Sequence, residues 1–343
     1  MTSILFKKFE NRKFITSSIV IFLISILYSL LHGSGFYGYG IDYHSGYSYG
    51  FEWLKPSAES NFLDYVGFRV ATLEINEFHL GVYVVTFVIT LATGLFIREL
   101  LKFKQNYSLV FFLLVFLIAI HTWPVIMSTS NAMRQGLTMS FLFLVFAYSF
   151  RKNLNYILLF SFLAIVMHNS GIFFVTIFIF ANILNKLLKN YSNKNKAIIN
   201  FSIGMLSLVA IYYAVNIILL SDNHQASRII SGDFRWAFII IAISYVILSF
   251  YFSNILTNPF NLSLYYFSFI SLPVVMNGLN WQYERLGMMM LIPYIFSFGS
   301  LLNSRSYKFY LVTSFSLLLL LTIYTDKYSV GLLSEFEIYL RSL

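Results

Sequence analysis

An arginine, Arg134, interrupts a long apolar part of this chain and is well placed to do chemistry. No Asp, Glu, Lys or Arg occurs at residues 105–133 before it or at residues 135–150 after it. A bilayer accepts a guanidinium at such a position only at a high free-energy cost, so the side chain more often faces a binding site than lipid. Pairing with a carboxylate between helices is the structural alternative.

A histidine, His168, lies in the only strongly polar cluster of another uncharged stretch. This stretch runs from residue 153 to residue 185, between Lys152 and Lys186, and the cluster reads Met-His-Asn-Ser-Gly at residues 167–171. Thirty-three residues are enough for two short spans with a turn between them. The turn, and with it His168, then faces the same side of the membrane as Arg134. His168 could act as a general base or as a structural hydrogen-bonding group.

Further candidates lie in three polar segments that follow apolar runs on this same side. Arginine offers a planar fork of donors that fits phosphate oxygens, carboxylates can accept a proton, and aromatic rings can stack on sugars. Together these side chains suit a substrate that joins a phosphate or diphosphate to a sugar. Ion pairing, lipid-headgroup binding and interfacial aromatic belts are the structural alternatives. The candidates are Asp42, Tyr43, Glu59 and Arg69 in residues 32–78, Arg228 and Arg235 in residues 221–235, Trp281, Tyr283, Glu284 and Arg285 in residues 277–285, and Gln135 beside Arg134.

The composition is that of a helical membrane protein. Hydrophobic residues make up 58% of the 343 residues, charged residues 11%, and the mean hydropathy is +0.74. We expect an all-α polytopic fold with about eleven transmembrane helices in one integral membrane domain, residues 1–343. The absence of cysteine excludes disulfides and thiolate chemistry, and no histidine pair has metal-ligand spacing. The spans fall roughly at 14–31, 79–97, 108–125, 134–150, 155–168, 170–185, 198–220, 236–256, 262–277, 285–302 and 309–324.

The positive charges orient these spans. Fifteen of the 23 Lys and Arg residues fall on one side, beginning with the cluster at residues 7–13, so we place the N-terminus and these residues in the cytoplasm. Eleven of those fifteen are lysines, whereas six of the eight on the other side are arginines. The net charge of +9 therefore indicates membrane anchoring and no nucleic-acid partner. No glycine-rich nucleotide motif is present, so no such cofactor is expected.

An ordered set of short motifs resembles the EpsG-like polysaccharide polymerases, relatives of the Wzy O-antigen polymerases. The set comprises Gly-Ile-Asp-Tyr at 40–43, Glu59 ahead of an aromatic residue, Arg-Gln at 134–135, Met-His-Asn-Ser-Gly at 167–171 and Arg-Leu at 285–286. The resemblance implies a GT-C-like helical glycosyltransferase in the bacterial inner membrane that acts at its periplasmic face. It implies an undecaprenyl-diphosphate-linked oligosaccharide as both donor and acceptor, and no metal or other cofactor.

The resemblance also implies roles for particular residues. Arg134 and Arg285, with Arg228 and Arg235 as further candidates, would bind the diphosphate. His168 or Asp42 would be the base, and the sequence does not choose between them. The other polar and aromatic candidates would contact the rest of the substrate. Besides membrane lipid, a chain-length regulator protein is a candidate partner. An O-antigen ligase and a flippase or transporter of lipid-linked glycan are the alternative functions.

Overall fold

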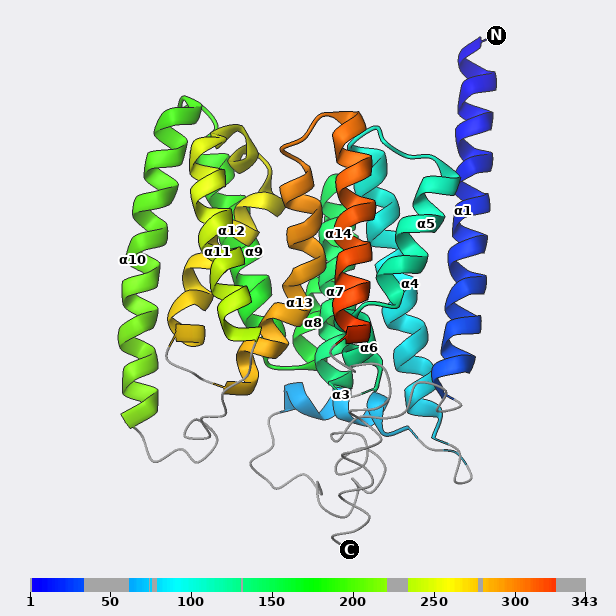
Figure 1. Cartoon of the computed structure of the whole chain (residues 1–343), viewed down its shortest axis with the longest axis horizontal. Helices are drawn as coiled ribbons and strands as arrows, with labels where there is room; N and C mark the ends of the chain where they lie inside the picture. The colour runs from blue at the N-terminus through cyan, green and yellow to red at the C-terminus, as the bar shows by residue number, and fades with distance from the viewer. Residues whose placement is uncertain are drawn as a thin grey trace, which may run out of the picture. The chain divides into compact units, whose positions relative to one another are not determined.

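The computed structural model is all-helical, which confirms the expected fold class. It describes residues 2–33, 62–73, 75, 79–130, 132–220, 234–276 and 280–324, and these contain thirteen α-helices, one 3-10 helix and no strand. Figure 1 shows that the chain is built of long helices. A helix satisfies most backbone donors and acceptors within its own segment, as a bilayer requires.

Six of the helices are long and apolar enough to cross a membrane, or seven if one bent pair is counted as a single span. They include α1 (Thr2–Gly33), α4 (Leu80–Phe103), α9 (Ser170–Leu187), α10 (Asn193–Leu220), α12 (Pro259–Met276) and α14 (Ser304–Tyr324). Residues 154–167, 236–251 and 290–299 form shorter apolar helices. The protein is therefore a multi-pass membrane protein, but the expected number of about eleven spans is not confirmed.

The chain divides into two compact units. Unit 1 comprises residues 1–172 and 304–343, and unit 2 comprises residues 173–303. The expectation of a single membrane domain stays a prediction. The three polar segments fall mainly outside the described residues, although part of the first forms α3 (Phe62–Ala71) and the third runs into α13 (Asn280–Gly299).

Unit 1 is built on the antiparallel pair α1 and α4. Ser29 on α1 donates a hydrogen bond to the carbonyl of Tyr83 at the start of α4, at 2.6 Å. On α4, the hydroxyls of Thr90 and Thr93 donate to carbonyls one turn earlier, each at 2.8 Å. The hydroxyls of Thr90 and Thr93 are thus satisfied within α4, which can pack closely against both α1 and α7 (Met133–Phe150).

A bend of 58° separates α5 (Leu109–Ile120) from α6 (Trp123–Ser130). The sequence predicts a span at 108–125, and in the structure the helix at this place is broken after Ile120. Pro124 explains the bend, because proline lacks an N–H and its ring clashes with the carbonyl four residues earlier. The carbonyl of Ile120 instead accepts from the hydroxyl of Tyr28 on α1, at 2.6 Å. The N–H of Trp123 donates to the hydroxyl of Thr322 on α14, at 2.9 Å.

Unit 2 has a core of buried tyrosines on α11 (Phe234–Tyr251), α12 and α13. The hydroxyls of Tyr245 and Tyr294 lie 2.6 Å from those of Ser297 and Ser268, respectively. Tyr266 on α12 donates to the side chain of Asn200 on α10, also at 2.6 Å. Each aromatic ring fills apolar space while its hydroxyl finds a partner on another helix, which holds the helices of this unit in register.

Candidate active site

Arg134 lies in the first turn of α7 and is half-buried. The carbon of its guanidinium group lies 5.9 Å from the centre of the Phe68 ring on α3. A guanidinium over an aromatic face is held by the ring quadrupole. This setting combines a fixed cation with a partly buried environment.

The hairpin of α7 and α8 (Leu154–Met167) places Arg134 and His168 at the same end of unit 1. The hydroxyl of Thr138, one turn after Arg134, donates to the carbonyl of Ala164 at 3.1 Å, and Ala164 lies one turn before His168. Because the two helices are antiparallel and in contact at this level, their next turns reach the same end together. The expectation that Arg134 and His168 share one side is thus supported by the helix register.

His168 ends α8 with an extended backbone, at φ −165° and ψ 146°. Its Nδ1 atom accepts a hydrogen bond from the backbone N–H of Ser170 at 3.1 Å and lies 2.9 Å from the Ser170 hydroxyl. Ser170 is the first residue of α9, whose first N–H groups have no partner within the helix. The imidazole therefore caps α9 and is fixed between the end of one helix and the start of the next.

The short helix α3 contacts Arg134 and the residue before His168. It lies across the ends of α7 and α8 (Figure 1) and packs against both. While Phe68 meets Arg134, its neighbour Gly67 lies directly on the carbonyl of Met167, the residue before His168. A Cβ atom at residue 67 would lie 1.9 Å from that carbonyl oxygen, a distance that no packed structure allows. Glycine is therefore what lets α3 reach the site.

We expect Gly67→Ala to destabilise the protein by about 1–3 kcal/mol, because the added methyl group forces α3 off the backbone of Met167. Chemical unfolding of the purified protein in mixed micelles measures this. The direction of the change in unfolding free energy serves as the control, because Gly→Ala inside a helix normally stabilises by up to about 1 kcal/mol. An unchanged or higher unfolding free energy would contradict this close packing.

Gln135 is buried beside Arg134, with 7% of its surface exposed. Its side-chain oxygen has no hydrogen-bond partner among the described residues. A buried acceptor in this condition carries a desolvation penalty that a substrate donor would relieve. A sugar hydroxyl would supply such a donor. Arg69, the neighbour of Phe68, is exposed on α3.

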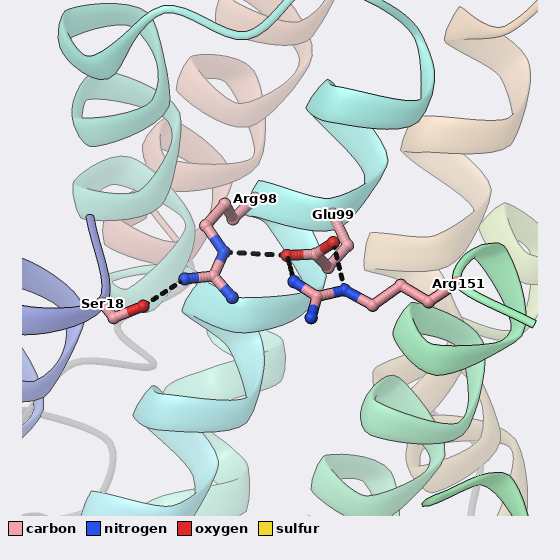
Figure 2. A network of polar contacts seen from close by, with 4 residues as sticks. All are labelled: Ser18, Arg98, Glu99 and Arg151. Atoms are coloured by element: carbon pink, nitrogen blue, oxygen red, sulfur yellow. Dashed lines mark hydrogen bonds and ion pairs between the residues drawn. The ribbon is translucent and has the colours of Figure 1, made fainter. Parts of the chain in front are cut away.

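The opposite end of unit 1 carries a buried ion network. The Glu99 carboxylate on α4 accepts from Nε of Arg98 at 2.9 Å and from Nε of Arg151 at 2.7 Å (Figure 2). Arg98 also donates to the hydroxyl of Ser18 on α1, at 2.6 Å. The hydrogen bonds from Arg151 to Glu99 raise the pKa of Arg151 and keep it charged at the end of α7. The network joins three helices of unit 1.

Among models of protein families, the EpsG family matches residues 18–226, more than half of the chain. The chain belongs to the EpsG family. This confirms the resemblance drawn from the short motifs and indicates a role of the polysaccharide-polymerase type. No curated protein and no solved structure matched the chain. The match includes Arg134, Gln135 and His168, and ends before α13.

In this EpsG-family protein, the structure does not show whether the other candidate residues belong to the site. Asp42, Tyr43, Glu59 and Arg228 lie outside the described residues. Arg235 belongs to α11, and α13 carries Trp281, Tyr283, Glu284 and Arg285, but their side chains are likewise outside the described part of the structure. The expected convergence of these side chains on Arg134 stays a prediction.

Three residues that support the site were not among the candidates predicted from the sequence. Phe68 and Thr138 act through contacts with residues that are distant in the sequence, and no sequence motif marks either of them. Ser170 did have one, since serine is favoured at the N-terminus of a helix. No group of three or more His, Asp or Glu residues able to hold a metal occurs among the described residues.

Proposed function

We propose that this EpsG-family protein polymerises lipid-linked oligosaccharide repeat units into O-antigen or a similar surface polysaccharide. The donor and the acceptor are both oligosaccharides on undecaprenyl diphosphate. The observation that carries the proposal is the half-buried Arg134 at the level of His168, beside the buried acceptor of Gln135. A cation and a fixed imidazole at one end of a membrane bundle suit a substrate whose diphosphate lies at the membrane surface.

The reaction is a glycosyl transfer. The bond between the anomeric carbon of the donor glycan and its diphosphate oxygen breaks, and a bond forms from that carbon to a hydroxyl oxygen of the acceptor glycan. Undecaprenyl diphosphate leaves with the electron pair, and the hydroxyl proton passes to a base. Arg134 stabilises the negative charge that develops on the leaving diphosphate.

The cations of unit 1 support a periplasmic location for the proposed site. Arg98 and Arg151 meet in the ion network, Lys102 lies near the ring of Tyr107, and Lys308 near that of Phe111. These residues lie at the end opposite Arg134 and His168, where α4 and α7 end and α5 and α14 begin. The positive-inside rule favours the cytoplasm for this cationic end, which supports the proposal that Arg134 and His168 act on the periplasmic side of the inner membrane.

Loss of the gene tests the function. In an encapsulated or smooth host, we expect its deletion to leave single repeat units on the carrier or on the lipid A core, seen on a gel of surface glycan. A ligase would leave no glycan on the core, and a flippase or transporter would leave none outside the cell. Either of these results, in place of single units, would overturn the proposal. A plasmid copy of the wild-type gene must restore long chains.

Metal independence is part of the proposal and has a separate test. Purified protein in nanodiscs, treated with a chelator, is expected to extend lipid-linked repeat units as fast as untreated protein. The arginines and helix N-terminus at this end supply positive charge that a metal would otherwise supply. A loss of extension that Mg²⁺ or Mn²⁺ restores would contradict this part.

A further inference from the structure

The hydrogen bond between Ser170 and His168 determines which nitrogen of the imidazole carries the proton. A backbone N–H can only donate, so Nδ1 of His168, at 3.1 Å from the Ser170 nitrogen, must present its lone pair. A proton on Nδ1 would place two donors against each other at that distance. The neutral imidazole therefore carries its hydrogen on Nε2.

We propose that His168 acts in glycosyl transfer as a hydrogen-bond donor through Nε2–H and is not the base. In this tautomer, the basic lone pair of the ring is occupied by the start of α9 and cannot accept the proton of a sugar hydroxyl. The Nε2–H group can instead donate to an oxygen that gains negative charge. This inference rests on the proposed function, because it assigns a role within that reaction.

The position of His168 suits an oxygen of the leaving diphosphate. His168 shares the level of Arg134, through the contact of Thr138 with Ala164. As the anomeric bond breaks, the electron pair moves to the diphosphate oxygen, where the fixed donor strengthens its hydrogen bond without transferring the proton. The hydroxyl proton of the acceptor must then pass to a carboxylate. The sequence left His168 and Asp42 open as the base, and this inference assigns that role to the acid.

The Ser170 N–H is the positioning group in this arrangement. Its hydrogen bond fixes the tautomer, and the extended backbone of His168 between α8 and α9 fixes the ring. The Ser170 hydroxyl is 2.9 Å from the same nitrogen and can either donate or accept, so it does not determine the tautomer by itself. Removal of the hydroxyl and removal of the N–H are therefore expected to have different effects.

Nuclear magnetic resonance tests the tautomer independently of activity. The full chain, labelled with ¹⁵N at its six histidines, is studied in nanodiscs, and the His168→Gln variant assigns the signal. We expect Nδ1 of His168 to have the chemical shift of an unprotonated ring nitrogen and Nε2 that of an N–H. A protonated Nδ1 at neutral pH would overturn the proposal.

The His168→Gln substitution distinguishes a hydrogen-bond donor from a base at this position. Its amide can donate near the position of Nε2–H but cannot accept a proton at neutral pH. In the deletion strain, we expect His168→Gln to form long chains within about tenfold of the wild-type rate. His168→Ala should lose about 100-fold or more, as for the loss of one donor to a developing oxyanion. Equal losses in the two variants, with both proteins present in the membrane, would assign the base role to His168.

Substitutions of Ser170 complete the test. Ser170→Ala keeps the N–H and should stay within about threefold of the wild-type rate. Ser170→Pro removes the N–H at the first position of α9, where helices tolerate proline, and should lose at least about tenfold. Equal rates for these two variants would contradict the positioning role. Failure of the polymerase proposal is seen separately, as absence of single repeat units in the deletion strain.

Discussion

Replacing Arg134 by lysine will abolish the extension of surface glycan while the protein still inserts in the membrane. Lysine keeps the charge but loses the planar fork that binds two phosphate oxygens at once and that lies over the ring of Phe68. We expect the rate of long-chain formation to fall by about 100-fold or more, the loss typical of one stabilising group for a developing oxyanion. The length distribution of the glycan in the complemented deletion strain measures this.

The matched control is the same substitution at Arg305, in the first turn of α14. Arg305 is exposed at the opposite, cationic end of unit 1. Arg305→Lys should therefore leave the chain lengths unchanged. Normal long chains from an Arg134→Lys protein would remove this residue from the site, and shortened chains from both variants would indicate a general effect of losing a guanidinium.

Replacing Glu99 by glutamine will strongly destabilise unit 1. The carboxylate balances Arg98, whose side chain is 3% exposed, and also pairs with Arg151. Without it, a buried guanidinium loses its counter-charge and faces a second one. We expect the unfolding free energy to fall by about 3–5 kcal/mol, as when one partner of a buried ion pair is removed. Unfolding of the purified protein in mixed micelles measures the loss.

A double-mutant cycle distinguishes the ion network from simple loss of packing. Arg98→Met in the Glu99→Gln background removes the buried charge that the first substitution leaves uncompensated. We expect the double variant to be less destabilised than the sum of the single variants. Additive losses would show that Glu99 does not act through Arg98.

The sequence was sufficient for the class of fold and for the family. Composition and apolar runs predicted the helices, and the motifs around Arg134 and His168 predicted the EpsG family that the comparison shows. Both signals are local, since a run of about twenty apolar residues or a short ordered motif can be seen without knowing what it packs against.

The parts of the site that depend on contact between distant segments were not predictable. Helix α3 lies in what the sequence presents as a polar segment, and its Gly67 and Phe68 lie against Met167 and Arg134. Glu99 and Arg98 were placed among ordinary cytoplasmic charges, because no local pattern shows that Arg151, 52 residues later, will pair with Glu99. Buried ion pairs depend on tertiary packing, which single-sequence reasoning does not reach.

The bend between α5 and α6 has a consequence for the order in which the protein is made. The polar backbone groups exposed there are satisfied by Tyr28 near the beginning of the chain and by Thr322 on its last described helix. During synthesis, α1 is available when α5 leaves the ribosome, but α14 is not. The N–H of Trp123 therefore waits for almost 200 further residues and gains its partner only late in translation, when α14 has been made.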